Sequence, residues 1–132
     1  FAHGVRRLFF HAGTCGAING PDAGGVLFEY GGEPRAMYAG VAAFTRFVGV
    51  PRACVWARCR DGLAAYVFHV RQGAAAVAWR PAGTATPRPL ASGLRAYDIM
   101  GNEIAPADVA LSEAPIYVTA PDAERIVAWL EN

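Results

Sequence analysis

The chain has 132 residues, the length of one domain, and 54% of them are hydrophobic whereas only 17% are charged. Its formal net charge of +1 leaves no basic stripe to neutralise phosphates, which argues against nucleic acid as a partner. No apolar run reaches the roughly 18 residues of a membrane-spanning helix, so no membrane association is predicted. The apolar excess predicts that part of the surface packs against another domain or subunit. The many Ala and Arg residues, without any Lys, are typical of a GC-rich bacterial genome.

The first 50 residues predict a strand, a loop and a helix. Residues 5–11 (VRRLFFH) suit a short strand, and seven glycines in residues 12–32 indicate a loop. Pro34 fits the first position of a helix, and Gly49 fits its C-terminal cap, with Pro51 preventing continuation. The apolar residues at helical spacing, which predict one face of this helix, are Met37, Val41, Phe44 and Val48.

After Pro51 the apolar period changes to two, which predicts an antiparallel sheet. Residues 53–60 and 63–71 are joined by Asp61-Gly62, a strong signal for a two-residue hairpin, and residues 74–79 add a third strand. Three cysteines, Cys15, Cys54 and Cys59, lack metal-type spacing and are interpreted as small buried hydrophobes. Because Cys54 and Cys59 are five residues apart on one strand, they are predicted to point to opposite faces.

The last third of the chain predicts further strands and a terminal helix. Gly101-Asn102 suggests a two-residue turn, with Ile99 and Ile104 paired across it. Asp98 is interpreted as a structural acceptor for backbone N–H groups at that turn. Strands are predicted near residues 109–112 and 115–120. A helix should open at Pro121-Asp122 and face inward through Ile126, Val127 and Leu130.

These elements predict an α+β, mainly β fold with two parts. Residues 1–49 form one strand–loop–helix unit, and residues 50–132 form an antiparallel, β-sandwich-like domain. The first part cannot fold by itself, because a lone strand leaves its hydrogen-bonding edges unpaired. A missing domain or another chain is therefore expected to pack on the N-terminal strand and helix.

Three motifs, in order, carry a family resemblance: GEPRAMYA at residues 32–39, YDIMGN at 97–102 and PIYV at 115–118. Together they resemble the C-terminal end of the clan A type of glycoside hydrolases, (β/α)8-barrel enzymes with an appended β-sandwich. The resemblance implies that residues 1–49 are the last βα unit of a TIM barrel and that residues 50–132 are the accessory domain. It implies a parent enzyme that hydrolyses O-glycosyl bonds in carbohydrates, with no cofactor and no metal.

The same resemblance places the catalytic groups elsewhere. In those families the two catalytic glutamates end the fourth and seventh barrel strands, which lie outside this chain, so no catalytic residue is assigned here. Glu29 and Glu33 are four residues apart, but Glu33 just before Pro34 suits a structural place at a helix N-terminus. His11 would end the last barrel strand, at the rim where barrel active sites are built. The candidate substrate-binding residues are His11, Thr14, Asn19 and Glu29.

Two other interpretations stay open. A free-standing carbohydrate-binding module would need exposed aromatic residues, for which Trp56, Trp79 and Tyr66 are candidates, although core packing is the simpler role. A non-enzymatic assembly domain would use residues 5–11 to complete a sheet in another chain. His69, between Phe68 and Val70, is predicted to be a core or surface histidine, and His11 with Cys15 and His3 leaves a metal site one ligand short.

Overall fold

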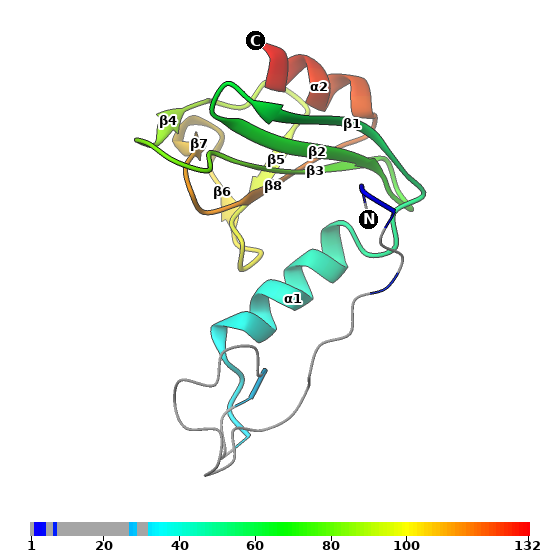
Figure 1. The fold of residues 1–132 in the computed structure, drawn as a ribbon, viewed down its shortest axis with the longest axis vertical. Helices are drawn as coiled ribbons and strands as arrows, with labels where there is room; N and C mark the ends of the chain where they lie inside the picture. The colour runs from blue at the N-terminus through cyan, green and yellow to red at the C-terminus, as the bar shows by residue number, and fades with distance from the viewer. Residues whose placement is uncertain (1, 5–6, 8–26, 29–31) are drawn as a thin grey trace.

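The computed structural model describes residues 2–4, 7, 27–28 and 32–132 (Figure 1). The strand predicted at residues 5–11 and most of the loop after it lie outside these residues. The described elements are α1 (Ala36–Phe47), β1 (Ala53–Arg60), β2 (Leu63–His69), β3 (Ala74–Trp79), β4 (Thr86–Pro87), β5 (Arg95–Tyr97), β6 (Glu103–Ile104), a 3-10 turn (Pro106–Asp108), β7 (Ala110–Leu111), β8 (Ile116–Ala120) and α2 (Ala123–Glu131).

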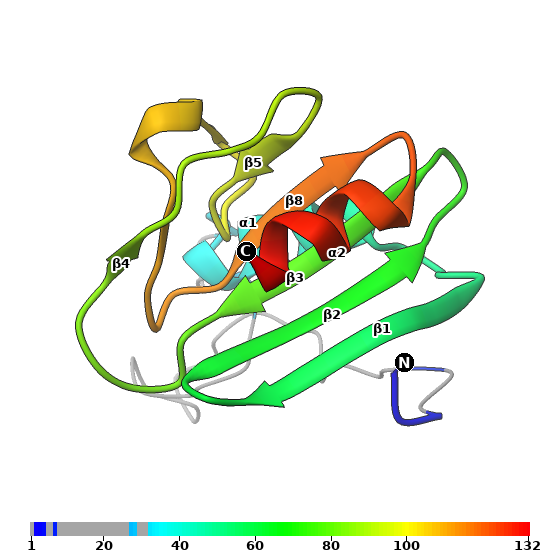
Figure 2. The same ribbon diagram turned by 90° about the horizontal axis from the view of Figure 1, so that it is seen from above.

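The strands form one six-stranded antiparallel sheet of order β1-β2-β3-β8-β5-β6 and a separate pair, β4-β7. The predicted α+β, mainly β class is confirmed. The larger sheet carries α2 on one face and the end of α1 on the other (Figure 2). Because helices cover both faces of this sheet, the arrangement does not establish the predicted β-sandwich.

In the meander, β1 and β3 have the predicted limits and the predicted hairpin is confirmed, whereas β2 ends at His69 rather than at residue 71. Asp61 and Gly62 both have positive φ, 54° and 72°, and Arg60 pairs with Leu63 across them. A mirror-image turn of this kind matches the twist of the two strands. The register of β1 shifts between Cys54 and Trp56, where Val55 forms a bulge.

The larger core lies between the sheet and α2. Alternate residues of β2, β3 and β8 face this helix. Val109 and Leu111 also belong to this core. The helix contributes Ala123, Ile126, Trp129 and Leu130 to this core. The inward face predicted from Ile126 and Leu130 is confirmed. Val127 is only partly buried, and Trp129, which was not predicted to face inward, is buried.

The smaller core lies on the opposite face, below β5 and β8. Phe47 stacks on Tyr97 with ring centroids 4.3 Å apart, and lies 5.1 Å from Tyr117. Ala43 and Val48 complete the buried part of this contact. The buried residues of α1 are only Ala43 and Phe47, both in its C-terminal half. Its N-terminal half projects away from the sheet (Figure 1).

The ends of α1 follow the prediction at one terminus and depart from it at the other. Gly49 has a φ of 56°, and its N–H donates to the Phe44 carbonyl at 3.1 Å, as expected of a left-handed residue after a helix. The helix begins at Ala36 rather than at Pro34, because Pro34 forms an isolated β-bridge with Phe28. The N-cap Arg35 makes no side-chain cap bond, and the first turn has no acidic residue.

Candidate functional site

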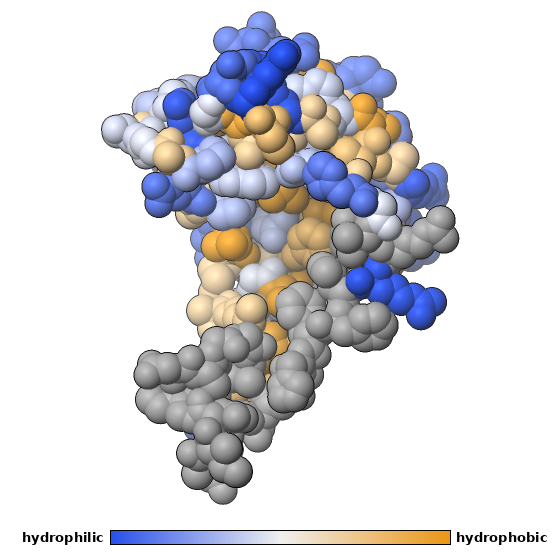
Figure 3. Space-filling view, in the orientation of Figure 1, coloured by the Kyte–Doolittle hydropathy of each residue, from blue (hydrophilic) through white to orange (hydrophobic). Residues whose placement is uncertain are grey.

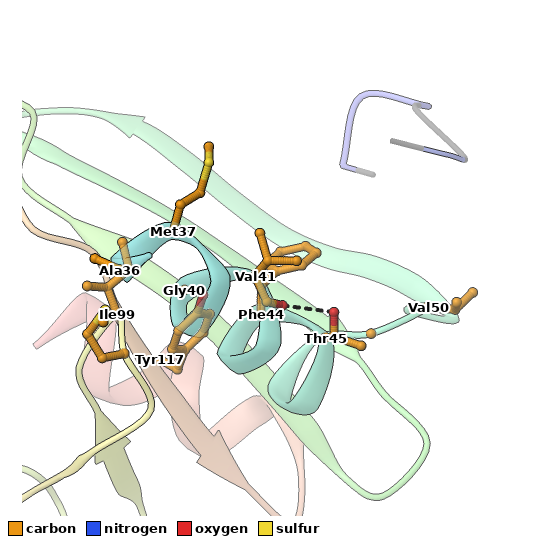
Figure 4. A pocket seen from close by; sticks show the side chains of 11 residues that line it. Ala36, Met37, Gly40, Val41, Phe44, Thr45, Val50, Ile99 and Tyr117 are labelled. Carbon is orange, nitrogen blue, oxygen red and sulfur yellow. Dashed lines mark hydrogen bonds between the residues drawn. The ribbon is translucent and has the colours of Figure 1, made fainter. Parts of the chain in front are cut away.

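The most distinctive surface is an open groove that runs along α1. It has a volume of about 880 Å³, within the range of roughly 300–1,000 Å³ of ligand and docking sites. One wall is the exposed stripe of α1, and the other is the hairpin between β5 and β6, with Tyr117 at the floor (Figure 4). The lining residues are Ala36, Met37, Gly40, Val41, Phe44, Thr45, Gly49, Val50, Ile99, Met100 and Tyr117.

Three of the four residues that helical spacing placed on one face of α1 line this groove: Met37, Val41 and Phe44. Met37 is 41% exposed, whereas Phe47, ten residues further along α1, is 8% exposed. Val41 and Phe44 are half-buried, and only Val48 of the predicted face is buried. In the space-filling view, apolar surface extends below the sheet along α1 (Figure 3). An apolar helix face that stays partly exposed, as at Met37, is the kind of surface that packs against another protein element.

The hairpin beside α1 differs from the prediction in its turn. The chain reverses through Ile99, Met100 and Gly101, because the Asp98 N–H donates to the Asn102 carbonyl at 2.9 Å and the Gly101 N–H donates to the Asp98 carbonyl at 3.0 Å. Gly101 has a φ of 90°, as the last position of such a three-residue loop requires. Ile104 therefore pairs with Ala96, and the predicted pairing of Ile99 with Ile104 is wrong.

Asp98 holds this turn, as its structural interpretation predicted. Its Oδ1 accepts the N–H groups of Met100 at 2.8 Å and Asn102 at 2.9 Å, and its Oδ2 accepts the Asn102 side-chain amide at 2.9 Å. Partial burial alone raises the pKa of this carboxyl, but the hydrogen bonds from Asn102, Met100 and Gly101 outweigh it and lower the pKa below the usual range. Asp98 is therefore ionised at neutral pH, and both of its carboxylate oxygens accept hydrogen bonds within the turn.

Gly101 also sets how closely the turn approaches α1. A Cβ atom at this position would lie 3.3 Å from the Cβ of Ala43, and the φ of 90° disfavours any other residue. The turn therefore rests directly on α1, while Ile99 and Met100 remain 40% and 39% exposed at the rim of the groove. Apolar side chains at the centre of a turn are unusual, because Gly, Pro, Asn, Asp and Ser dominate there.

The chemistry of the groove is apolar. Among the described residues that line it, none is Asp, Glu, His, Lys or Arg. The Thr45 hydroxyl already donates to the Val41 carbonyl at 2.8 Å. Tyr117 is buried, and burial raises the pKa of its phenol. These residues offer no acid–base pair, so the groove is suited to packing rather than to catalysis.

The four candidate substrate-binding residues, His11, Thr14, Asn19 and Glu29, lie outside the described residues, as does Cys15. Glu33 is described and is exposed just before α1. Within the described ranges, no group of three or more His, Cys, Asp and Glu side chains could hold a metal ion.

Five described carboxylates have structural partners. Asp98 binds its own turn, and Asp61 and Glu103 form ion pairs with Arg58 and Arg95 at 2.8 Å each. Asp122 caps α2, and Glu131 accepts from Trp56 Nε1 at 3.3 Å. These contacts give the five carboxylates fixed roles in the fold.

The three aromatic residues considered as a sugar platform do not share a face. Tyr66 and Trp79 stack at 6.0 Å on the side of α1. Trp56 pairs with Val67 and packs on the side of α2. A joint platform of all three is therefore not formed.

The cysteine prediction is wrong in its geometry. The bulge at Val55 shifts the alternation of β1, so that Cys54 pairs with Phe68 and Cys59 pairs with Ala64, on the same face of the sheet. Both are free thiols, and Cys59 is exposed, with its Sγ 3.1 Å from the Tyr66 hydroxyl oxygen. His69 is exposed, which agrees with a surface histidine.

The sequence reasoning missed Ile99 and Met100 as surface residues. The signal was present, since Asp98 followed three residues later by Gly101 fits a turn that starts at Asp98. None of the described helices is long and apolar enough to cross a membrane. No protein-family profile, curated protein or solved structure matches this chain.

Proposed function

We propose that the chain is the C-terminal accessory portion of a glycoside hydrolase, which braces a catalytic barrel through α1 and contributes to one side of the sugar cleft. The observation that carries this proposal is the apolar side of the first half of α1, where the Met37 side chain is 41% exposed. Complete burial of such a side chain contributes about 1.5–3 kcal/mol relative to exposure. A preceding domain that covers α1 would supply this contribution.

The lack of local support for α1 favours the same proposal. A helix of 12 residues is marginal in water, and α1 has neither a side-chain N-cap nor an acidic residue in its first turn. Its sheet contact stabilises only the C-terminal half. A domain packed on the N-terminal half, from Ala36 to about Gly40, would add to the contact that Phe28 makes with Tyr38 there.

The lack of carboxyl groups among the described residues of the groove supports a bracing role rather than a catalytic one. Glycoside hydrolysis needs two carboxyl groups about 5–10 Å apart across the scissile bond. The groove has none among its lining residues, so the proposal assigns the acid–base pair to the barrel. His11, Thr14, Asn19 and Glu29 remain the proposed sugar contacts.

The test compares the product of the complete reading frame with the 132-residue chain. Hydrolysis of a panel of aryl glycosides is expected from the complete polypeptide and not from the 132-residue chain. An alternation of strands and helices over about 250 residues should precede Phe1. Turnover by the 132-residue chain, or a preceding sequence without this alternation, would overturn the proposal.

A further inference from the structure

We draw no further inference here: the strongest candidate, the open apolar groove between α1 and the turn at residues 98–102, carries none because nothing in the described part of the structure shows what covers it.

Discussion

The two helices differ in how completely this chain supports them. α2 has an N-cap at Asp122, whose Oδ1 accepts the Arg125 N–H at 3.0 Å, and it buries Ile126 and Leu130 almost completely. α1 has no side-chain cap and buries only its last turns. The comparison teaches that contacts with the sheet support α2 along its whole length, whereas the contact of α1 with the sheet is confined to its C-terminal half.

The C-terminal end of α2 is also stabilised by contacts within the chain. Arg88 Nη1 donates to the carbonyls of Trp129 and Leu130 at 2.7 and 3.2 Å, where a cation is favoured by the helix dipole. The guanidinium lies 5.7 Å from the Trp129 ring, and Trp129 Nε1 donates to the Pro89 carbonyl at 3.0 Å. These contacts hold the segment around Arg88 and Pro89, before β5, against α2.

The largest expected loss of stability comes from removing the Trp129 side chain, which packs α2 on the sheet. Trp129→Ala should lower the free energy of unfolding by about 3–5 kcal/mol, because it leaves a cavity and an unpaired Pro89 carbonyl. Urea denaturation followed by circular dichroism measures this loss. Val55→Ser, at an exposed position of β1, should change the same quantity by less than about 0.5 kcal/mol. Similar losses for both variants would contradict the assignment of Trp129 to the core.

The next comparison is within α1 itself. Phe47→Ala should cost about 3 kcal/mol, because the ring packs between Tyr97 and Tyr117, and Met37→Ala should cost less than about 0.5 kcal/mol in the 132-residue chain. Urea midpoints of the two variants measure the difference. A large loss for Met37→Ala in this chain would show that the first half of α1 is already covered, and the proposed bracing role would then lose its basis.

A smaller effect is expected at the cap of α2. Asp122→Ala should lower the free energy of unfolding by about 1 kcal/mol, because the Arg125 N–H loses its acceptor. Asp122→Asn keeps an oxygen in the same place and serves as the control. The variants are compared by thermal unfolding at neutral pH. Equal melting temperatures for Asp122→Ala and the unmodified chain would show that the cap does not stabilise α2.

The smallest effect is a pH dependence at the turn beside α1. The pKa of Asp98 is lower in the folded chain than its unfolded value of about 3.9, so its contribution is complete above that value and is lost as the pH falls through the folded pKa. Asp98→Asn should remove this part of the acid dependence, measured as urea midpoints between about pH 2 and 6. An unchanged dependence in Asp98→Asn would assign it to other carboxylates.

The sequence by itself determined the elements whose signals are local. Asp61-Gly62 fixed a two-residue hairpin, Gly49 marked the end of α1, and Asp122 marked the start of α2, because positive φ and capping depend on neighbouring residues alone. The α+β class followed from the change of apolar period after Pro51. These expectations are confirmed by the described residues.

Only the tertiary structure decided which apolar faces are covered. Helical spacing placed Met37 and Phe44 on one apolar face of α1, but spacing does not show what lies over such a face. The bulge at Val55 reversed the predicted face of one cysteine, and the choice between two turns at Asp98 placed Ile99 and Met100 at the groove rather than in a strand. The covering of α1 and the bulge depend on contacts between distant residues, which local patterns do not encode, whereas the turn is held by hydrogen bonds within residues 98–102.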